Sequence, residues 1–217
     1  MDLDPVEDIV RVKKPAELDE RTVAPNPVHQ FQAWFEDALA SGMPMADAMT
    51  VCTATSDGKP SARMILLKEV DESGFVFYTN YRSRKARELD ANPFAALVFY
   101  WEPLERQVRV EGRVTRISAA ESDKYFETRP RESQLGAIAS PQSEVIPSRT
   151  VLEENFQKLE EEYRDESRPV RRPDHWGGYR LTPEQIEFWK GRPGRLHDRL
   201  LYELQPDGTW RLSRLAP

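Results

Sequence analysis

Apolar residues recur along this chain with two different periods, and the period predicts the type of element. Between Pro27 and Leu39 they recur every three or four residues, the spacing of one helix face, and Ser41-Gly42 ends that stretch. From Ala48 onward, short apolar and β-branched runs alternate with turn sequences, which is typical of strands. The pattern therefore predicts an N-terminal helix followed by a region rich in strands.

The predicted strands follow one another along the chain with mostly short turns. They cover residues 48–55, 62–70, 75–79, 94–101, 106–117, 176–181, 186–189, 199–204 and 210–215. Helices are predicted between them at 83–90, 118–128, 130–139 and 151–163, and Pro130 separates the second from the third because proline starts a helix but breaks its interior. This order favours an antiparallel β-barrel with helical decorations, an α+β fold, over a doubly wound parallel sheet.

Residues 1–26 are polar and contain scattered prolines without any period, so we predict a mobile N-terminal arm there and a single domain over residues 27–217. No apolar run approaches the roughly 20 residues that cross a bilayer, which argues against a membrane protein. The acidic N-terminus lacks the apolar stretch of a signal peptide. The single cysteine, Cys52, excludes an intramolecular disulfide and fits a reducing compartment, so we expect a cytoplasmic protein.

The charge distribution indicates the kind of ligand. A net charge of −6 argues against nucleic-acid binding, which needs a basic surface. The arginines are nevertheless grouped, at 82/84/87, 129/131, 171/172 and 192/195/199. An acidic protein with local basic clusters suits small phosphorylated molecules. The three histidines lie far apart in the sequence without metal-ligand spacing, so we expect no metal site.

Ser83 stands where a helix is predicted to begin, and its side chain suits the N-cap. Arg84 and Lys85 then fall in the first turn, where the helix dipole disfavours cations unless an anion is present. Free backbone N–H groups beside Arg and Lys form a phosphate site. The alternative is that both cations point to solvent; we favour the phosphate site.

Near the C-terminus an apolar-aromatic run stops at Gly191–Gly194 and continues as Arg195-Leu-His197-Asp-Arg199. Read as a strand, this stretch places Arg195, His197 and Arg199 on one face. These cations repel one another unless an anion or water lies among them. A solvated strand face explains the same pattern, but the adjacent Trp189 and the Gly-rich turn favour a flat anionic ligand.

Three weaker patterns stay open on the residues alone. Arg63 and Lys68 are five apart, so they reach one ligand only if their strand ends or bulges or if the ligand wraps its edge; two solvated charges are the simpler interpretation. Tyr125, Arg129 and Ser133 form a phosphate cradle only where one helix follows another across Pro130, and an exposed helix surface is simpler. The amides of Gln107 and Gln142, the latter followed by Ser143, suit the edge of a heterocycle but are also common surface residues.

Taken together and in order, these motifs resemble the pyridoxine (pyridoxamine) 5′-phosphate oxidase family, FMN enzymes of vitamin B6 metabolism. The resemblance covers about Pro27 to Pro217. It rests on Arg63-Met-Ile-Leu-Leu-Lys68, Phe77-Tyr-Thr-Asn80, Ser83-Arg-Lys-Ala86, Leu104-Glu-Arg-Gln-Val108, Tyr125-Phe, Arg129-Pro-Arg-Glu-Ser-Gln134, Trp176-Gly-Gly-Tyr179, Gln185-Ile-Glu-Phe-Trp189, Arg195-Leu-His-Asp-Arg199 and Arg214-Leu-Ala-Pro217.

The resemblance implies an FMN-binding split barrel that forms a homodimer, with each FMN at the subunit interface. The implied FMN contacts are Arg63, Met64, Ile65, Leu66, Leu67, Lys68, Tyr78, Thr79, Arg84, Lys85, Gln107, Gln142, Ser143, Trp189 and Arg199. The implied contacts to the substrate phosphate are Lys68, Tyr125, Arg129 and Ser133. Arg195 and His197 are the implied catalytic residues, covering the pyridine ring on the face away from the flavin, and positioning is the role we prefer for both.

The implied reaction is oxidation of pyridoxine or pyridoxamine 5′-phosphate to pyridoxal 5′-phosphate, as in a pyridoxal 5′-phosphate synthase. A hydride equivalent passes from C4′ to flavin N5, and oxygen then yields hydrogen peroxide. One departure is that Ile9-Val-Arg-Val-Lys-Lys14 lacks the tyrosine of the family's Arg-x-x-Tyr arm motif, which puts closure of the arm over the site in doubt. The alternatives are a split-barrel flavin oxidase of the phenazine-biosynthesis type, and a non-catalytic split-barrel protein that binds flavin or haem.

Overall fold

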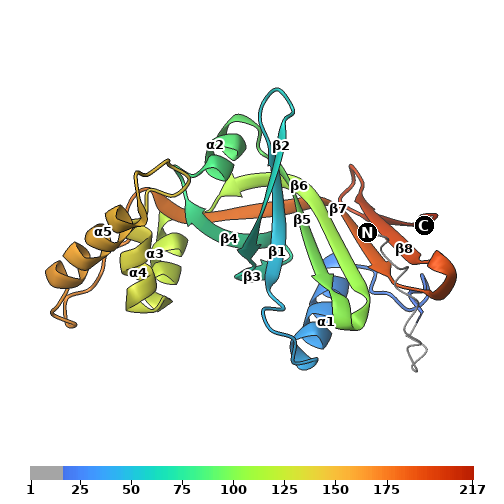
Figure 1. Ribbon diagram of the computed structural model, residues 1–217. Helices are drawn as coiled ribbons and strands as arrows, with labels where there is room; N and C mark the ends of the chain where they lie inside the picture. The colour runs from blue at the N-terminus through green and yellow to red at the C-terminus, as the bar shows by residue number, and fades with distance from the viewer. Residues whose placement is uncertain (1–16) are drawn as a thin grey trace, which may run out of the picture.

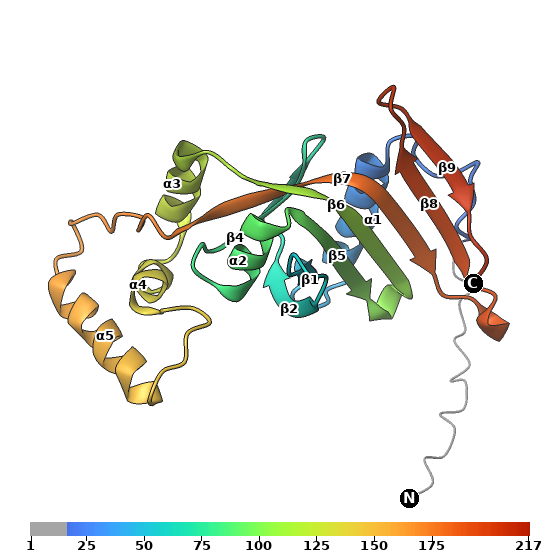
Figure 2. The same ribbon diagram turned by 90° about the horizontal axis from the view of Figure 1, so that it is seen from above.

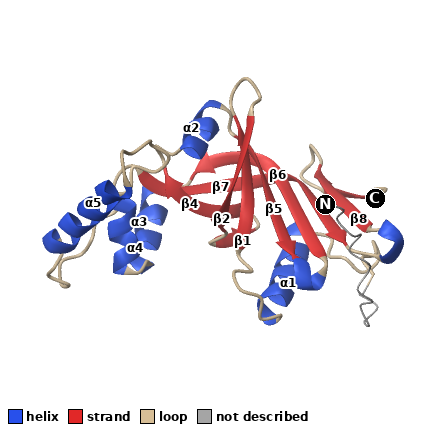
Figure 3. Cartoon of the chain, in the orientation of Figure 1, coloured by secondary structure: helices blue, strands red, loops and turns tan. Residues whose placement is uncertain are grey.

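The computed structural model describes residues 17–217 (Figures 1 and 3). All pairs of neighbouring strands in its nine-stranded sheet are antiparallel. The strands are β1 (Ala48–Ala54), β2 (Pro60–Leu66), β3 (Glu69–Asp71), β4 (Gly74–Asn80), β5 (Phe94–Trp101), β6 (Arg106–Arg116), β7 (Trp176–Lys190), β8 (Asp198–Leu204) and β9 (Trp210–Arg214). The helices are α1 (Pro27–Ala40), α2 (Arg84–Ala91), α3 (Ala119–Thr128), α4 (Arg131–Ala139) and α5 (Arg149–Glu162), with short 3-10 turns η1 (Glu102–Leu104) and η2 (Pro193–Arg195). Within residues 17–217, no helix is long and apolar enough to cross a membrane.

The sheet curls because its two edge strands are consecutive in the chain. The strand order is β2-β1-β5-β6-β7-β4-β3, and only Leu67 and Lys68 connect β2 to β3. The three Cα–Cα steps from Leu66 to Glu69 span at most about 11 Å, so these ends of the two strands must lie close together. The Lys68 backbone N–H donates to the carbonyl of Val76 in β4 at 2.9 Å. The predicted antiparallel barrel is confirmed, but the single strand predicted over 62–70 is wrong, since Leu67 and Lys68 interrupt it.

β7 is one continuous strand of 15 residues, so the two separate strands predicted over 176–181 and 186–189 are wrong. Its first half pairs with β4 and its second half with β8, while β6 pairs along both halves. The register between β6 and β7 shifts between Glu111 and Gly112, which pair with Gln185 and Pro183, so Glu184 is the extra residue in β7. A Cβ at Gly112 would lie 2.0 Å from the carbonyl oxygen of Thr182, so this close backbone approach requires glycine.

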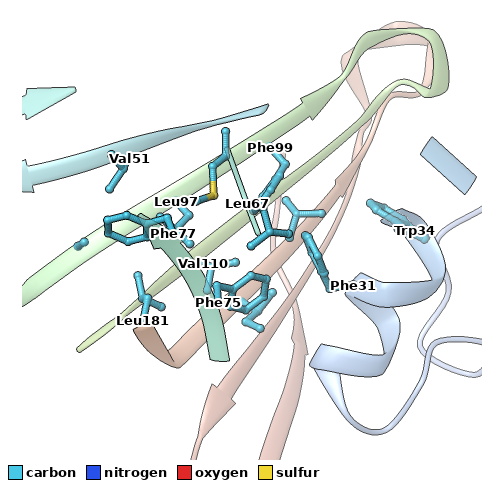
Figure 4. Packing of buried hydrophobic residues seen from close by; sticks show 14 of the residues in the cluster. Phe31, Trp34, Val51, Leu67, Phe75, Phe77, Leu97, Phe99, Val110 and Leu181 are labelled. Atoms are coloured by element: carbon cyan, nitrogen blue, oxygen red, sulfur yellow. The ribbon is translucent and has the colours of Figure 1, made fainter. Parts of the chain in front are cut away.

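The main core lies between the curled sheet and α1 (Figure 4). The helical period of α1 turns Phe31 and Trp34 toward the sheet. Phe31 packs edge-on against Phe75 of β4 at 4.8 Å and against Phe99 of β5 at 4.9 Å. Complete burial of aromatic side chains of this size provides the largest apolar contribution to the stability of the barrel.

A smaller second cluster lies under α3, α4 and α5 and contains Phe126, Leu135, Val170 and Trp176. In Figures 1 and 2 these helices gather at one end of the molecule, whereas β8 and the C-terminus lie at the other. β7 runs between the two ends.

The predicted N-terminal arm falls mostly outside the described residues, as does the motif at 9–14. Its described part contacts the C-terminal strands: Leu18 is buried in the main core, and its carbonyl accepts a hydrogen bond from Arg214. Arg214 also pairs with Glu20 at 2.6 Å.

Candidate cofactor and substrate site

A cavity of about 430 Å³ opens where β2 ends, beside β4 and α3. Its wall contains four cations and no carboxylate, although the whole protein is acidic. It is lined by Arg63, Met64, Ile65, Leu66, Lys68, Tyr78, Thr79, Lys85, Tyr125, Arg129, Gln142 and Trp176. Eleven of the residues predicted for FMN or substrate thus meet in one place, together with Trp176, for which no role was predicted.

The end of β2 explains how Arg63 and Lys68 reach the same cavity. Five residues apart in an unbroken strand they would face opposite sides, but β2 ends at Leu66. Lys68 leaves the sheet there and forms an ion pair with Asp47 at 3.0 Å. The side chain of Leu67, which was also predicted to contact FMN, instead lies in the main core.

Lys85 is the most deeply buried cation of the cavity. Ser83 caps α2 as predicted, with its hydroxyl accepting from the Ala86 N–H, and this places Lys85 in the first turn. Only 7% of Lys85 is exposed, and its ammonium donates to Thr79 Oγ1 at 3.0 Å and to Gln142 Oε1 at 3.2 Å. Burial, and secondarily the charge of Arg63, lower the pKa of Lys85 to about 8. No carboxylate of residues 17–217 pairs with it, so the site favours an anion.

One buried carboxylate, Glu88, forms ion pairs with both Arg63 and Arg84. Glu88 was not identified from the sequence. Glu88 pairs with Arg84 Nε at 2.8 Å and with Arg63 at 3.5 Å, and it accepts hydrogen bonds from the hydroxyls of Thr53 and Ser61. These hydrogen bonds outweigh burial and lower the pKa of Glu88 to about 2. Arg84 is largely exposed and lies outside the cavity lining.

Arg129 enters the cavity from the junction of α3 and α4. It caps the end of α3 with an extended backbone, as expected for a residue before proline, and Pro130 begins α4. Its guanidinium lies 4.6 Å from the centre of the Trp176 ring, and its Nη1 atom is buried without a hydrogen-bond partner among the described residues. Burial also lowers the pKa of Arg129. An unsatisfied buried donor at the cavity wall suits an incoming anion.

The remaining residues predicted near this cavity differ in position. Tyr125 stacks on Tyr78 with ring centres 3.9 Å apart. Ser133 lies in the first turn of α4 and is half-buried, outside the cavity lining. Ser143 follows Gln142 with a left-handed backbone, φ +71°, and is exposed.

A second group of predicted residues forms a row across three strands. Gln107 of β6 lies opposite Trp189 of β7, and Trp189 lies opposite Arg199 of β8. Residues opposite one another in neighbouring strands share a face of the sheet. The Arg199 guanidinium pairs with the buried carboxylate of Glu187 at 2.8 Å. These three residues, far apart in sequence, are therefore neighbours in space.

Arg195 and His197 lie beside this row, but not on a strand. Pro193 and Gly194 form η2, Arg195 has a left-handed backbone with φ +59°, and β8 begins only at Asp198. The prediction that Arg195, His197 and Arg199 alternate along one strand face is therefore wrong. Arg195 is exposed. His197 packs against Trp189 at 4.6 Å, and its Nδ1 accepts from the Arg192 N–H at 3.1 Å.

The two groups are separated within one chain. Trp176 lines the cavity at the start of β7, and Trp189 belongs to the row at its end. The two positions are 13 residues apart, which corresponds to roughly 40 Å along the strand. The cavity and the row are therefore separate groups of residues within one chain.

Comparison with known proteins was made for the whole chain. Residues 35–163 match the family model for pyridoxamine 5′-phosphate oxidase, and residues 176–217 match the model for the C-terminal dimerisation region of pyridoxine 5′-phosphate oxidase. A protein from Cyanothece sp. named pyridoxine/pyridoxamine 5′-phosphate oxidase is 56% identical over 212 residues, 98% of each chain. A protein of the same name from Burkholderia lata is 56% identical over 204 residues, 93% of this chain and 94% of the other.

Two solved structures show the same architecture. PhzG from Burkholderia lata, in complex with tetrahydrophenazine-1-carboxylic acid, superposes with a TM-score of 0.87 at 29% identity, covering 94% of this chain and all of that one. An FMN-binding protein related to pyridoxamine 5′-phosphate oxidase, from Nostoc punctiforme, superposes with a TM-score of 0.71 at 18% identity, covering 90% of this chain and all of that one. The fold is thus an FMN-binding split barrel.

Proposed function

This chain belongs to the pyridoxamine 5′-phosphate oxidase family, and from that premise we propose that it oxidises pyridoxine 5′-phosphate or pyridoxamine 5′-phosphate with oxygen, using FMN. The products are pyridoxal 5′-phosphate and hydrogen peroxide, with ammonia from the amine. The observation that carries the proposal is the pair of cations, Lys85 and Arg129, that face one cavity without carboxylate partners among the described residues.

Those two cations suit the two phosphates of the reaction. Lys85, at the N-terminus of α2, fits the FMN phosphate because backbone N–H groups and the helix dipole add to its charge. Arg129, with Lys68, Tyr125 and Ser133, fits the phosphate of the substrate, since a guanidinium with a free donor binds phosphate strongly.

We further propose that the active unit is a homodimer in which the half-sites of two chains meet. One chain contributes the cavity, with Arg63–Leu66, Lys68, Tyr78, Thr79, Lys85 and Gln142, and also contributes Arg84 and Ser143, which lie outside the cavity lining. The other contributes Gln107, Trp189 and Arg199 toward FMN, and Arg195 and His197 toward the pyridine ring. The roughly 40 Å of β7 between the half-sites supports this arrangement, and the match of residues 176–217 to a dimerisation region is consistent with it.

Bound FMN would supply the redox chemistry, as the two-electron acceptor for the hydride equivalent of C4′, with oxygen as the final oxidant. The residues of the chain bind the substrate and orient it. The Arg192 N–H donates to Nδ1 of His197, so the neutral imidazole carries its proton on Nε2 and presents a hydrogen-bond donor. Arg195, exposed on η2, is free to lie over the pyridine ring. Holding the ring in a fixed orientation lowers the entropic part of the activation barrier for the oxidation.

The phenazine-type oxidase is the second candidate, because PhzG superposes closely. Two proteins from Burkholderia lata allow the candidates to be compared. This chain is 56% identical to the one named pyridoxine/pyridoxamine 5′-phosphate oxidase and 29% identical to PhzG. The residues assigned to the substrate phosphate and the pyridine ring are all present here. We therefore favour the B6 phosphates.

The test is an aerobic assay of the purified protein with both B6 phosphates, alongside its visible spectrum. We expect a flavin spectrum, formation of pyridoxal 5′-phosphate and an equal amount of peroxide. Protein that holds FMN but forms no pyridoxal 5′-phosphate from either substrate would contradict the proposal, and turnover of a reduced phenazine carboxylate would then identify the second candidate.

A further inference from the structure

Trp176 is the one cavity residue with no assigned role, and its indole faces two of the four residues proposed for the substrate phosphate, Tyr125 and Arg129. Its indole, 6% exposed, begins β7. It lies nearly parallel to Tyr78, with ring centres 5.3 Å apart, and to Tyr125, at 6.3 Å. The Arg129 guanidinium lies over the same indole at 4.6 Å.

Aromatic ring faces, not hydrogen bonds or ion pairs, hold the Arg129 side chain among the described residues. No hydrogen bond or ion pair to the guanidinium occurs there, and Nη1 is buried without a partner. Phe126 provides a second, more distant face at 5.7 Å. Two other cations of the cavity differ, since Arg63 pairs with Glu88 and Lys68 with Asp47.

This difference has a chemical consequence. A carboxylate that orients an arginine also neutralises it and occupies its N–H donors. An aromatic face holds the cation through the ring quadrupole and leaves every N–H free for another acceptor. The Arg129 guanidinium therefore remains un-neutralised, and its N–H donors are available to the phosphate of the substrate.

We propose that Trp176 is a positioning residue for substrate binding: its indole fixes the Arg129 guanidinium for the phosphate of the substrate without neutralising it. The proposal rests on the function proposed above and deepens it. It assigns to Trp176 a share of the affinity for the phosphorylated substrate, and none of the chemistry at C4′.

The experiment compares Trp176→Leu with Trp176→Phe in FMN-loaded protein, by steady-state kinetics with pyridoxine 5′-phosphate. A largely desolvated cation–π contact corresponds to about a 5- to 30-fold change in KM, and we expect that rise in Trp176→Leu with kcat changed less than about twofold. Trp176→Phe keeps a weaker ring face, so a rise of about threefold is expected. The Phe variant decides the question if the Leu variant does not fold.

Two controls separate positioning from general damage. Trp34→Leu is a matched control, because Trp34 is also 6% exposed and lies 4.5 Å from an arginine, Arg106, outside the cavity. Its KM should stay near the wild-type value. In an Arg129→Ala background, Trp176→Leu should raise KM no further, because the group that it positions is gone.

An unchanged KM in Trp176→Phe and Trp176→Leu would overturn the proposal. So would an equal rise with and without Arg129, or an equal rise in Trp34→Leu. If the wild-type protein turns over neither B6 phosphate, the proposed function fails, and the role of Trp176 is then read from titration with pyridoxal 5′-phosphate. The same 5- to 30-fold loss of affinity in Trp176→Leu supports it, and equal affinities refute it.

Discussion

The protonation of Lys85 should control how tightly the protein holds FMN. Burial and the neighbouring Arg63 lower the pKa of Lys85 to about 8, from an ordinary value of 10.5. The ammonium form binds a phosphate, and the neutral amine does not. Below pH 8 the site is charged before FMN arrives; above pH 8 the protein must take up a proton to bind it, and that uptake weakens binding.

The magnitude follows from this pKa. Between pH 7 and pH 9 the fraction of free protein with a charged Lys85 falls about tenfold, so the Kd for FMN should rise about tenfold, or about 1.4 kcal/mol. The phosphate of FMN, with a second pKa near 6, remains a dianion over this range and contributes little to the change.

The assay is a titration of apoprotein with FMN, followed by quenching of flavin fluorescence at pH 7, 8 and 9. Lys85→Met is the control: it keeps a long side chain and removes the titrating group. We expect weaker binding at pH 7, by about 1.5–3 kcal/mol for a lost charged hydrogen bond, and no tenfold change with pH. A flat wild-type profile, or the same pH dependence in Lys85→Met, would refute the assignment of Lys85 to the FMN phosphate.

Two other substitutions test separate parts of the structure. Arg195→Ala should raise KM for pyridoxine 5′-phosphate and leave the FMN content unchanged, because Arg195 is exposed on η2 and makes no packing contact in the core; unchanged kinetics would remove its assigned role. Glu88→Gln should flatten the acid dependence of stability. The pKa of Glu88 is lowered from 4.5 to about 2, so its contribution, on the order of 3 kcal/mol, is present above pH 4.5 and is lost as pH falls toward 2. Urea unfolding at pH 7 and pH 3 measures it, and equal pH dependence in both proteins would contradict the assignment.

Local sequence signals predicted the elements well where one residue type determines the backbone. Ser83 and Ser118 cap α2 and α3 as expected, and Pro130 separates α3 from α4. β5 has the predicted bounds because Phe94–Trp101 is an unbroken apolar and aromatic run between Asn92-Pro93 and Glu102-Pro103. In each case the deciding interaction lies within a few residues of chain.

The failures arose where distant residues decide the outcome. Two strands were predicted on either side of residues 182–185, but β7 is continuous there because β6 pairs across this stretch, with Glu184 as the extra residue in the register. Alternation suggested a strand through Arg195, but Pro193 and Gly194 form a turn there. The roles of Glu88 and Trp176 depend on contacts with Arg63 and Arg129, and sequence spacing carries no signal of either contact.

The separation of the half-sites was equally invisible in the sequence. The motifs named the residues, and only the length of β7 shows that Arg129 and Arg195 do not meet within one chain. The central claim is therefore that each active site combines the cavity of one chain with the Arg195 loop of another.

The most direct test is the activity of heterodimers purified with two different tags. A heterodimer of Arg129→Ala and Arg195→Ala chains contains one site with both substitutions and one intact site, so we predict about half of the wild-type rate of pyridoxal 5′-phosphate formation. A heterodimer of wild-type chain with a chain carrying both substitutions contains no intact site and should be as impaired as the single variants. The reverse result, with activity only in the second heterodimer, would contradict the claim and place each site within one chain.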